Sequence, residues 1–143
     1  MSVRFKLARA QRGFTLLELL VVLVILGMLA ALAGPRVMKY VSSAKTDTAQ
    51  LQIEELGAAL DMYKLEVGRH PNTQEGLQAL VEAPGGATNW NGPYLKKKTV
   101  PKDPWGADYI YVSPGQHGAF DLSSLGADGR EGGEGEDRDI VSW

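Results

Sequence analysis

Hydrophobic residues form one unbroken run near the N-terminus of the chain. Residues 14–34 read FTLLELLVVLVILGMLAALAG, in which Glu18 is the single charged residue. A helix of this length spans roughly 31 Å, about the thickness of the hydrocarbon core of a bilayer. Residues 1–13 carry basic residues and no acidic residue, and such a segment stays on the cytoplasmic side of a membrane. The pattern predicts a basic leader over residues 1–13, a membrane-spanning helix over residues 14–34, and the bulk of the chain outside the cytoplasm.

In the segment that follows, hydrophobic residues recur every three or four positions. This seam consists of Ile53, Leu56, Leu60, Tyr63 and Val67. The spacing is typical of an amphipathic helix that packs against a core, and Gly68 and Pro71 mark its end. We therefore predict one helix from about residue 14 to about residue 67. Because proline lacks a backbone donor and clashes with the preceding turn, we expect the helix to be broken near residues 34–35, where Gly34-Pro35 should kink or locally loosen it.

Shorter elements are predicted for the rest of a globular domain that covers residues 35–143. Asn72 to Glu75 has the pattern of a helix start, so we expect a short helix over about residues 73–82. Residues 84–106 are rich in glycine, proline and asparagine and predict a loop. Three strands are predicted, at residues 107–112, 118–123 and 139–142. The order of elements indicates an α+β fold in which a small antiparallel sheet packs on the long helix.

Composition and charge exclude several classes of function. The chain has no cysteine, which rules out a disulfide, a thiolate zinc site and a cysteine nucleophile. Its net charge of −2 argues against nucleic-acid binding. No serine lies in a Gly-x-Ser-x-Gly elbow, and the only histidines, His70 and His117, fall in surface turns, so we expect no enzymatic activity. A basic run, Lys96–Lys98, fits either a solvated loop tip or a contact with an acidic surface of another subunit.

Residues 125–139, the acidic loop, combine five glycines with six carboxylates, those of Asp128, Glu131, Glu134, Glu136, Asp137 and Asp139. Calcium takes six to eight oxygen ligands from flexible loops, whereas glycine and like charge also favour disorder. An EF-hand is excluded because Arg130 and Gly132 occupy ligand positions of that motif. The residues alone leave a calcium site and a disordered loop equally open.

The position of Glu18 distinguishes two processing schemes. Ala31-Leu32-Ala33 fits the cleavage site of a secretory signal, and cutting there would release a soluble product. Cleavage between Gly13 and Phe14 would instead keep the helix and create an amine at Phe14. A carboxylate in hydrocarbon is costly unless it lies near the interface or is paired, and the Phe14 amine of a neighbouring helix could neutralise Glu18. Only the second scheme explains Glu18.

The segment Gly13-Phe14-Thr15-Leu16-Leu17-Glu18 resembles the cleavage and methylation motif of type IV pilins and pseudopilins. Pro35 also falls where members of this family usually carry a proline. The resemblance implies cutting after Gly13 by prepilin peptidase and N-methylation of Phe14. It further implies a type IV pilin-like fold, a single-pass helix in the inner membrane, and assembly into a homopolymeric filament through packed N-terminal helices.

Residues near the C-terminus are similar to those of the major pseudopilins of type II secretion systems. The similar segments are Asp103-Pro104-Trp105-Gly106, Leu125-Gly126-Ala127-Asp128-Gly129 and Asp139-Ile140. In that family the loop binds one calcium ion, which implies Asp128 and the Leu125 carbonyl as ligands. Asp139 is the next ligand implied, with Asp137 as its competitor, and the Arg130 carbonyl is a further candidate.

The resemblance implies a structural subunit of a periplasmic pseudopilus, whose growth pushes folded proteins through an outer-membrane channel. Implied partners are further copies of the chain, minor pseudopilins, an inner-membrane assembly platform and prepilin peptidase. A type IV pilin or related surface fibre is the alternative. Most type IV pilins close a C-terminal loop with a disulfide, so the absence of cysteine counts against it, as does the calcium-type loop. An exported hydrolase released after Ala33 is a third hypothesis, and the absence of a catalytic motif counts against it.

Overall fold

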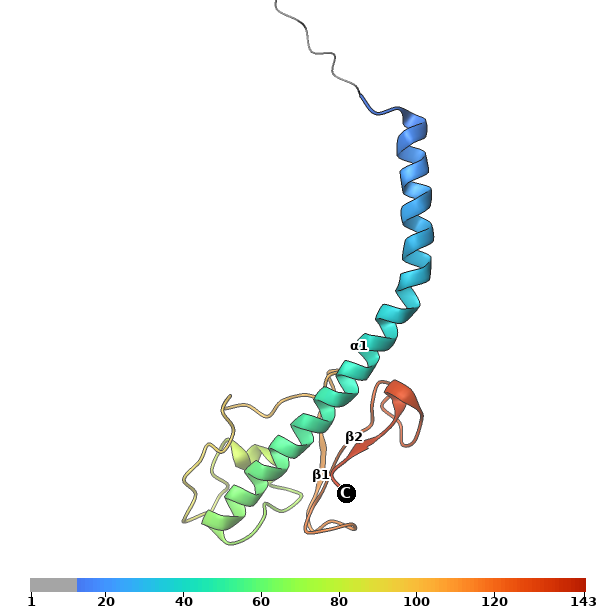
Figure 1. The fold of residues 1–143 in the computed structure, drawn as a ribbon. Helices are drawn as coiled ribbons and strands as arrows, with labels where there is room; N and C mark the ends of the chain where they lie inside the picture. Colours follow the sequence, from blue (N-terminus) through green and yellow to red (C-terminus); the bar gives the residue numbers. More distant parts are fainter. Residues whose placement is uncertain (1–12) are drawn as a thin grey trace, which may run out of the picture. The chain divides into compact units, whose positions relative to one another are not determined.

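The computed structural model describes residues 13–143, so the predicted basic leader lies outside the described residues except for Gly13. One long helix, two short 3₁₀ helices and three short strands make up its regular structure (Figure 1). In chain order they are α1 (Leu16–Val67), η1 (Leu77–Leu80), β1 (Ile110–Val112), β2 (Asp121–Ser124), η2 (Gly135–Asp137) and β3 (Ile140–Val141).

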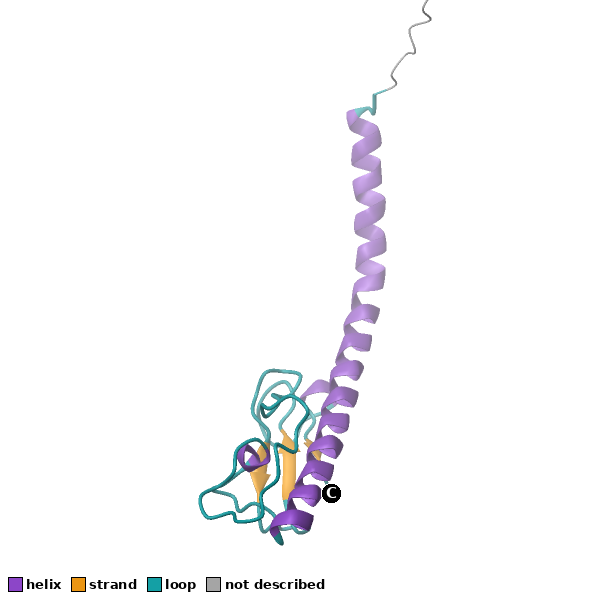
Figure 2. Ribbon diagram, turned by 90° about the vertical axis from the view of Figure 1, so that its left-hand side faces the viewer, coloured by secondary structure: helices purple, strands orange, loops and turns teal. Residues whose placement is uncertain are grey.

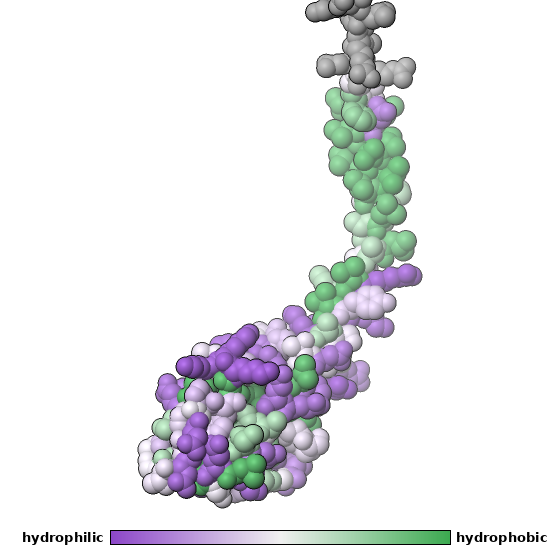
Figure 3. Space-filling view, turned by 60° about the vertical axis from the view of Figure 1, so that its left-hand side comes forward, coloured by the Kyte–Doolittle hydropathy of each residue, from purple (hydrophilic) through white to green (hydrophobic). Residues whose placement is uncertain are grey.

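The N-terminal part of α1 exposes hydrophobic side chains on every side. Every large hydrophobic residue from Phe14 to Leu32 is exposed, and Figure 3 shows these side chains covering the visible surface of this part of the helix. The helix is long and apolar enough to cross a membrane, and none of its most apolar window is buried. A core helix of a water-soluble domain would bury this surface, so this part of α1 requires a lipid or protein environment.

The predicted break at residues 34–35 is wrong. α1 is continuous from Leu16 to Val67, with Pro35 inside it. Proline at position 35 removes the one donor that would bond the carbonyl of Ala31, whereas the donors of its neighbours remain. The hydrogen bonds on either side are sufficient to continue the helix through this position.

The C-terminal part of α1 belongs to a compact unit formed by residues 39–143. Four of the predicted seam residues are fully buried, namely Ile53, Leu56, Leu60 and Tyr63, and Val67 packs against them. The same core includes Tyr111 and Leu122 from the sheet and Leu80 from η1. The periodic seam is therefore the surface on which the rest of the domain folds, as the spacing predicted.

The sheet is three-stranded and antiparallel, in the order β1-β2-β3, and α1 lies along it (Figure 2). Tyr111 pairs with Leu122 in the β1–β2 register, and Ser124 pairs with Ile140 in the β2–β3 register. Alternation along each strand directs Tyr111, Leu122 and Ile140 into the core. The predicted α+β fold with an antiparallel sheet is confirmed, although each strand is shorter than predicted.

The predicted helix over residues 73–82 is replaced by turns and the 3₁₀ helix η1. Its start signal is real, because Asn72 Oδ1 accepts from the Glu75 amide at 2.8 Å and Glu75 Oε2 accepts from the Asn72 amide at 2.8 Å. Gly76 then adopts a positive φ of 59°, which is incompatible with a right-handed α-helix. The capping box therefore closes a turn, and the 3₁₀ helix η1 follows it in place of an α-helix.

Glu75 also links this turn to the end of α1. Arg69 donates to both carboxylate oxygens of Glu75, at 2.6 and 2.7 Å. This bidentate bond is the main reason that the pKa of Glu75 lies below its ordinary value. The chain reversal after α1 is thus held by one guanidinium and one carboxylate.

The buried seam gives a stability prediction for a fragment of residues 35–143. Leu60→Ala should lower the free energy of unfolding by about 2–5 kcal/mol, because Leu60 is 0% exposed. Leu51→Ala is the matched control, since Leu51 lies on the same helix and is 57% exposed. Urea unfolding followed by tryptophan fluorescence measures both, and equal losses in the two variants would contradict the assigned core.

The Arg69–Glu75 bond predicts a pH-dependent contribution to stability. Because the folded pKa of Glu75 lies below the ordinary value of 4.5, this contribution is present above that pH and is lost as the pH falls through the folded pKa. The melting temperature of Glu75→Gln should therefore fall below that of the parent at neutral pH and converge with it in acid. Glu82→Gln, at an exposed position, is the control, and a difference that persists in acid would refute the assignment.

Candidate functional site

The first candidate site lies at the start of α1, around Glu18. Thr15 and Glu18 cap the helix reciprocally: Thr15 N donates to Glu18 Oε2 at 3.3 Å, and Glu18 N donates to Thr15 Oγ1 at 3.2 Å. Such a capping box satisfies two donors that have no partner within the helix. Sequence reasoning missed the role of Thr15, although the Thr-x-x-Glu spacing was there to indicate it.

The capping box leaves part of the Glu18 carboxylate free. Among the described residues, Oε1 accepts no hydrogen bond, and the side chain remains exposed. Phe14, which precedes the cap, is 87% exposed. The end of the helix therefore holds one carboxylate oxygen that is oriented by its own backbone and available to a cation from another molecule.

The second candidate site is the acidic loop, which is closed by backbone contacts. Ala127 N donates to Glu136 O at 2.8 Å. Gly126 has a φ of +67°, and a Cβ added there would overlap the Glu136 carbonyl oxygen and lie 2.9 Å from that of Arg138. Glycine is therefore required at this position, and the two ends of the loop lie directly against each other.

The two candidate carboxylates near the end of the acidic loop have different surroundings. Asp139 Oδ2 accepts from Gly132 N at 2.9 Å, whereas its Oδ1 is buried and has no hydrogen-bond partner. Asp137 lies in η2 with its side chain exposed. A buried carboxylate oxygen without a partner costs free energy unless a cation or water satisfies it. By this test Asp139 fits a metal ion better than Asp137 does.

The other sequence-predicted ligands lie at the start of the loop. Asp128 is exposed, and its Oδ1 accepts from Arg130 N at 3.0 Å. Leu125 is half-buried at the end of β2. Within residues 13–143, no group of three or more His, Asp or Glu side chains is arranged to hold a metal ion. A calcium site here would therefore depend on backbone carbonyls and water as well as on Asp128 and Asp139, which is within the chemistry of the ion.

A buried polar network lies beneath the start of the acidic loop, and sequence reasoning did not anticipate it. Asp103 and Ser124 are 5% and 1% exposed. Ser124 Oγ donates to Asp103 Oδ2 at 2.6 Å and accepts from Gly126 N at 3.3 Å. Burial, with the charge of Asp103 as a second cause, raises the pKa of the neighbouring Tyr109. The Asp103-Pro104-Trp105-Gly106 motif was the only signal in this region, and it does not indicate the partner Ser124.

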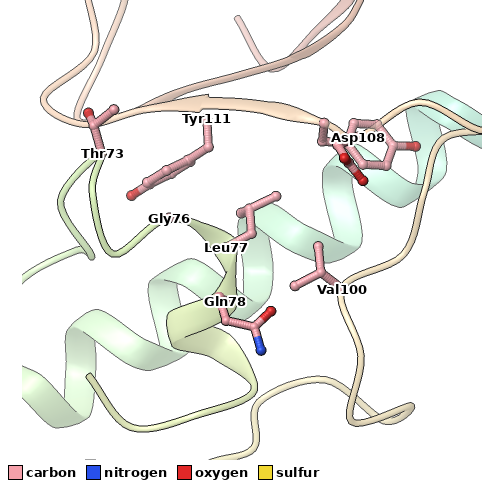
Figure 4. A pocket seen from close by; sticks show the side chains of 8 residues that line it. Thr73, Gly76, Leu77, Gln78, Val100, Asp108 and Tyr111 are labelled. Carbon is pink, nitrogen blue, oxygen red and sulfur yellow. The ribbon is translucent and has the colours of Figure 1, made fainter. Parts of the chain in front are cut away.

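A shallow groove of about 340 Å³ lies between η1, β1 and the segment around Val100 (Figure 4). The hydroxyl of Thr73, which lines the groove, is hydrogen-bonded to the backbone of Ser113. Asp108 is the one charged residue of the lining, and it forms an ion pair with Lys102 at 3.1 Å. No nucleophile with an adjacent base lines it.

Each histidine pairs with a carboxylate and an aromatic ring. His70 contacts Asp61 at 3.1 Å and meets Phe120 edge to face. His117 contacts Asp121 at 3.1 Å and stacks on Trp143. Neither histidine contacts a serine or threonine hydroxyl within the described part of the chain. The His70 contacts link α1 to Phe120, the His117 contacts stabilise the hairpin between β1 and β2, and neither set forms a catalytic triad.

Two protein-family models match the chain, over residues 8–34 and 36–143. One, described as type II secretion system (T2SS), protein G, matches residues 36–143. The other, described as a prokaryotic N-terminal methylation motif, matches residues 8–34. Type II secretion system core protein G of Pseudomonas aeruginosa is 54% identical over 139 residues, 94% of this chain and 96% of that protein. The protein of the same name from Vibrio cholerae is 48% identical over 141 residues, 96% of this chain and 95% of that protein.

A solved structure is also similar to the chain. The crystal structure of the major pseudopilin from the type 2 secretion system of enterohaemorrhagic Escherichia coli matches with a TM-score of 0.62 at 34% identity, over 74% of this chain and 92% of that one. This match confirms the predicted pilin-like fold. With a family match over residues 36–143 and relatives of this identity, the chain belongs to the protein G family of type II secretion systems, the major pseudopilins.

Proposed function

We propose that the chain polymerises into a periplasmic pseudopilus whose growth drives folded proteins across the outer membrane. The observation that carries the proposal is the N-terminal part of α1, which exposes hydrophobic side chains on all sides yet begins with a capped carboxylate. Such a helix is stable either in lipid or packed among copies of itself. A filament core of packed helices would bury the same surface that the bilayer buries before assembly.

Membership in a family of structural subunits confirms the prediction that the chain is not an enzyme. The chemistry of the proposed function is therefore that of assembly. Cleavage after Gly13 by prepilin peptidase would leave Phe14 with a free amine, to which a methyl donor would then transfer one methyl group. The Oε1 atom of Glu18 would accept a hydrogen bond from this amine, in its protonated form, on a neighbouring subunit. Oε2 would keep its bond to the Thr15 amide. Pairing the two charges offsets the cost of each in hydrocarbon.

A subunit of this kind would cross the inner membrane once and would need partner proteins for assembly. The single apolar helix would anchor the subunit in the inner membrane, with residues 35–143 in the periplasm. Extraction from the membrane would require an inner-membrane assembly platform, and minor pseudopilins would share the filament. The exposed lysines of the run Lys96–Lys98 would then be available to an acidic surface of an adjacent subunit.

We propose further that the acidic loop binds one calcium ion. Asp128, Asp139 and the Leu125 carbonyl would be ligands, with the Arg130 carbonyl as a further candidate and Asp137 as the alternative to Asp139. The buried, unpartnered Oδ1 of Asp139 supports this choice. Bound calcium would supply positive charge to a segment in which residues 121–143 carry seven acidic and two basic side chains, and would reduce their mutual repulsion.

The pairing of charges predicts the behaviour of two Glu18 variants in the full-length chain. Glu18→Ala removes both the cap and the charge, whereas Glu18→Gln retains an acceptor for the Thr15 amide and removes the charge alone. Both should insert into the membrane and lose most of the filament yield, measured by sedimenting the filaments that are released when the outer membrane of cells that make the secretion system is opened. Intact mass should show cleavage after Gly13 in parent and variants. Normal filament yield from Glu18→Gln would contradict the pairing.

The calcium proposal predicts a metal-dependent difference in melting temperature. A fragment of residues 35–143 should melt at a higher temperature in calcium than in EDTA, because an ion that binds only the folded state stabilises it. Asp128→Ala and Asp139→Asn should abolish most of this difference. Glu134→Gln, at an exposed position in the same loop, should retain it. Equal melting temperatures of the parent in calcium and in EDTA would contradict the proposal that the acidic loop binds calcium.

A further inference from the structure

The buried network of Asp103 and Ser124 is bonded to the Leu125–Gly126 peptide, whose carbonyl is a proposed calcium ligand. We infer that Asp103 is a positioning residue: acting through Ser124, it orients the Leu125 carbonyl toward the proposed calcium ion. The inference rests on the proposed calcium site. Asp103 itself is no ligand, because its carboxylate is already engaged inside the domain.

The carboxylate of Asp103 is held rigidly by its own turn. Its Oδ1 accepts from the amides of Trp105 at 3.1 Å and Ala107 at 2.8 Å. Asp103 N donates to Ala107 O at 2.9 Å, and Gly106 N donates to Asp103 O at 3.0 Å. These bonds fix the direction of the remaining oxygen, Oδ2, toward β2.

The second step is the hydroxyl of Ser124, which has a single proton. An ionised carboxylate only accepts hydrogen bonds, so the 2.6 Å contact places the Ser124 proton on the side of Asp103 Oδ2. A lone pair of Oγ is thereby directed to Gly126 N, 3.3 Å away. Asp103 thus determines that Ser124 acts as an acceptor toward the loop.

The third step follows from the planarity of the peptide bond. The amide of Gly126 and the carbonyl of Leu125 belong to one peptide unit, and in a trans unit they point in opposite directions. Fixing the Gly126 amide toward the buried Ser124 therefore directs the Leu125 carbonyl away from the domain interior, to the side of the loop. The bond to Ser124 also polarises the peptide and makes its carbonyl oxygen a stronger ligand.

The other surroundings of this peptide leave it little freedom to rotate. Gly126 is buried at a positive φ against the carbonyls of Glu136 and Arg138, and Ala127 N is bonded to Glu136 O. The candidate ligand Asp128 follows one residue later. The Asp103–Ser124 network and the segment Glu136–Arg138 therefore hold the same peptide from two sides.

The test measures calcium affinity of the full-length chain in detergent by isothermal titration. Asp103→Asn retains an acceptor for the turn but places an amide against Ser124, and Ser124→Ala removes the hydroxyl. Each should raise the Kd for calcium about ten- to hundred-fold, the range typical for residues that orient metal ligands. The double variant should bind no more weakly than Ser124→Ala alone, because Asp103 acts through Ser124. Asp108→Asn, at an exposed carboxylate of the neighbouring segment, should leave the Kd unchanged.

The possible outcomes separate this inference from the calcium proposal. A parent chain that binds no calcium overturns both. A parent that binds calcium, with variants of unchanged Kd and melting temperatures lowered equally in calcium and in EDTA, leaves the calcium site standing and reduces Asp103 to a purely structural residue. Additive losses in the double variant would show that Asp103 does not act through Ser124 and would also overturn the inference.

Discussion

Helix α1 must satisfy two environments along one continuous element, and the rest of the structure depends on how it does so. From Phe14 to Leu32 its hydrophobic side chains are exposed on all sides, so this part is stable only where lipid or other helices cover it. Beyond residue 39 the buried hydrophobic residues of α1 lie on one seam, which packs Ile53, Leu60 and Tyr63 into the core of the domain. The first part therefore demands partners, whereas the second completes its core within the chain.

Two carboxylates, one near each end of the described chain, have one oxygen bonded to a backbone amide and one oxygen without a protein donor. Glu18 lies in the apolar helix, and one of its oxygens is satisfied by the Thr15 amide. Asp139 is partly satisfied by the Gly132 amide and retains one buried oxygen without a partner. In each case a backbone donor orients the carboxylate, and the remaining oxygen is available to a cation. We propose a neighbouring subunit's amine at the first site and calcium at the second.

Asp103 differs from both, because it is buried and its carboxylate is satisfied completely by protein donors. Two amides and the Ser124 hydroxyl bond it, so it needs no cation. Its charge is used instead to set the direction of Ser124 and, through Gly126, of one carbonyl of the acidic loop. This difference between satisfied and unsatisfied carboxylates separates residues that orient the loop from residues that could bind a metal ion.

The sequence by itself determined the elements that arise from local patterns. The apolar run, the seam of α1, the individual strands and the motif around Glu18 could all be read from local sequence, because each reflects neighbours within a few residues. Only the tertiary structure decided that α1 passes through Pro35 unbroken and that Gly76 turns the chain away from a second α-helix. It also joined Asp103 to Ser124 and left Asp139, rather than Asp137, with a buried oxygen. The continuity at Pro35 depends on the helical hydrogen bonds on either side of it. The other outcomes depend on contacts between segments far apart in the chain or on a single backbone dihedral, and neither leaves a periodic signal in the sequence.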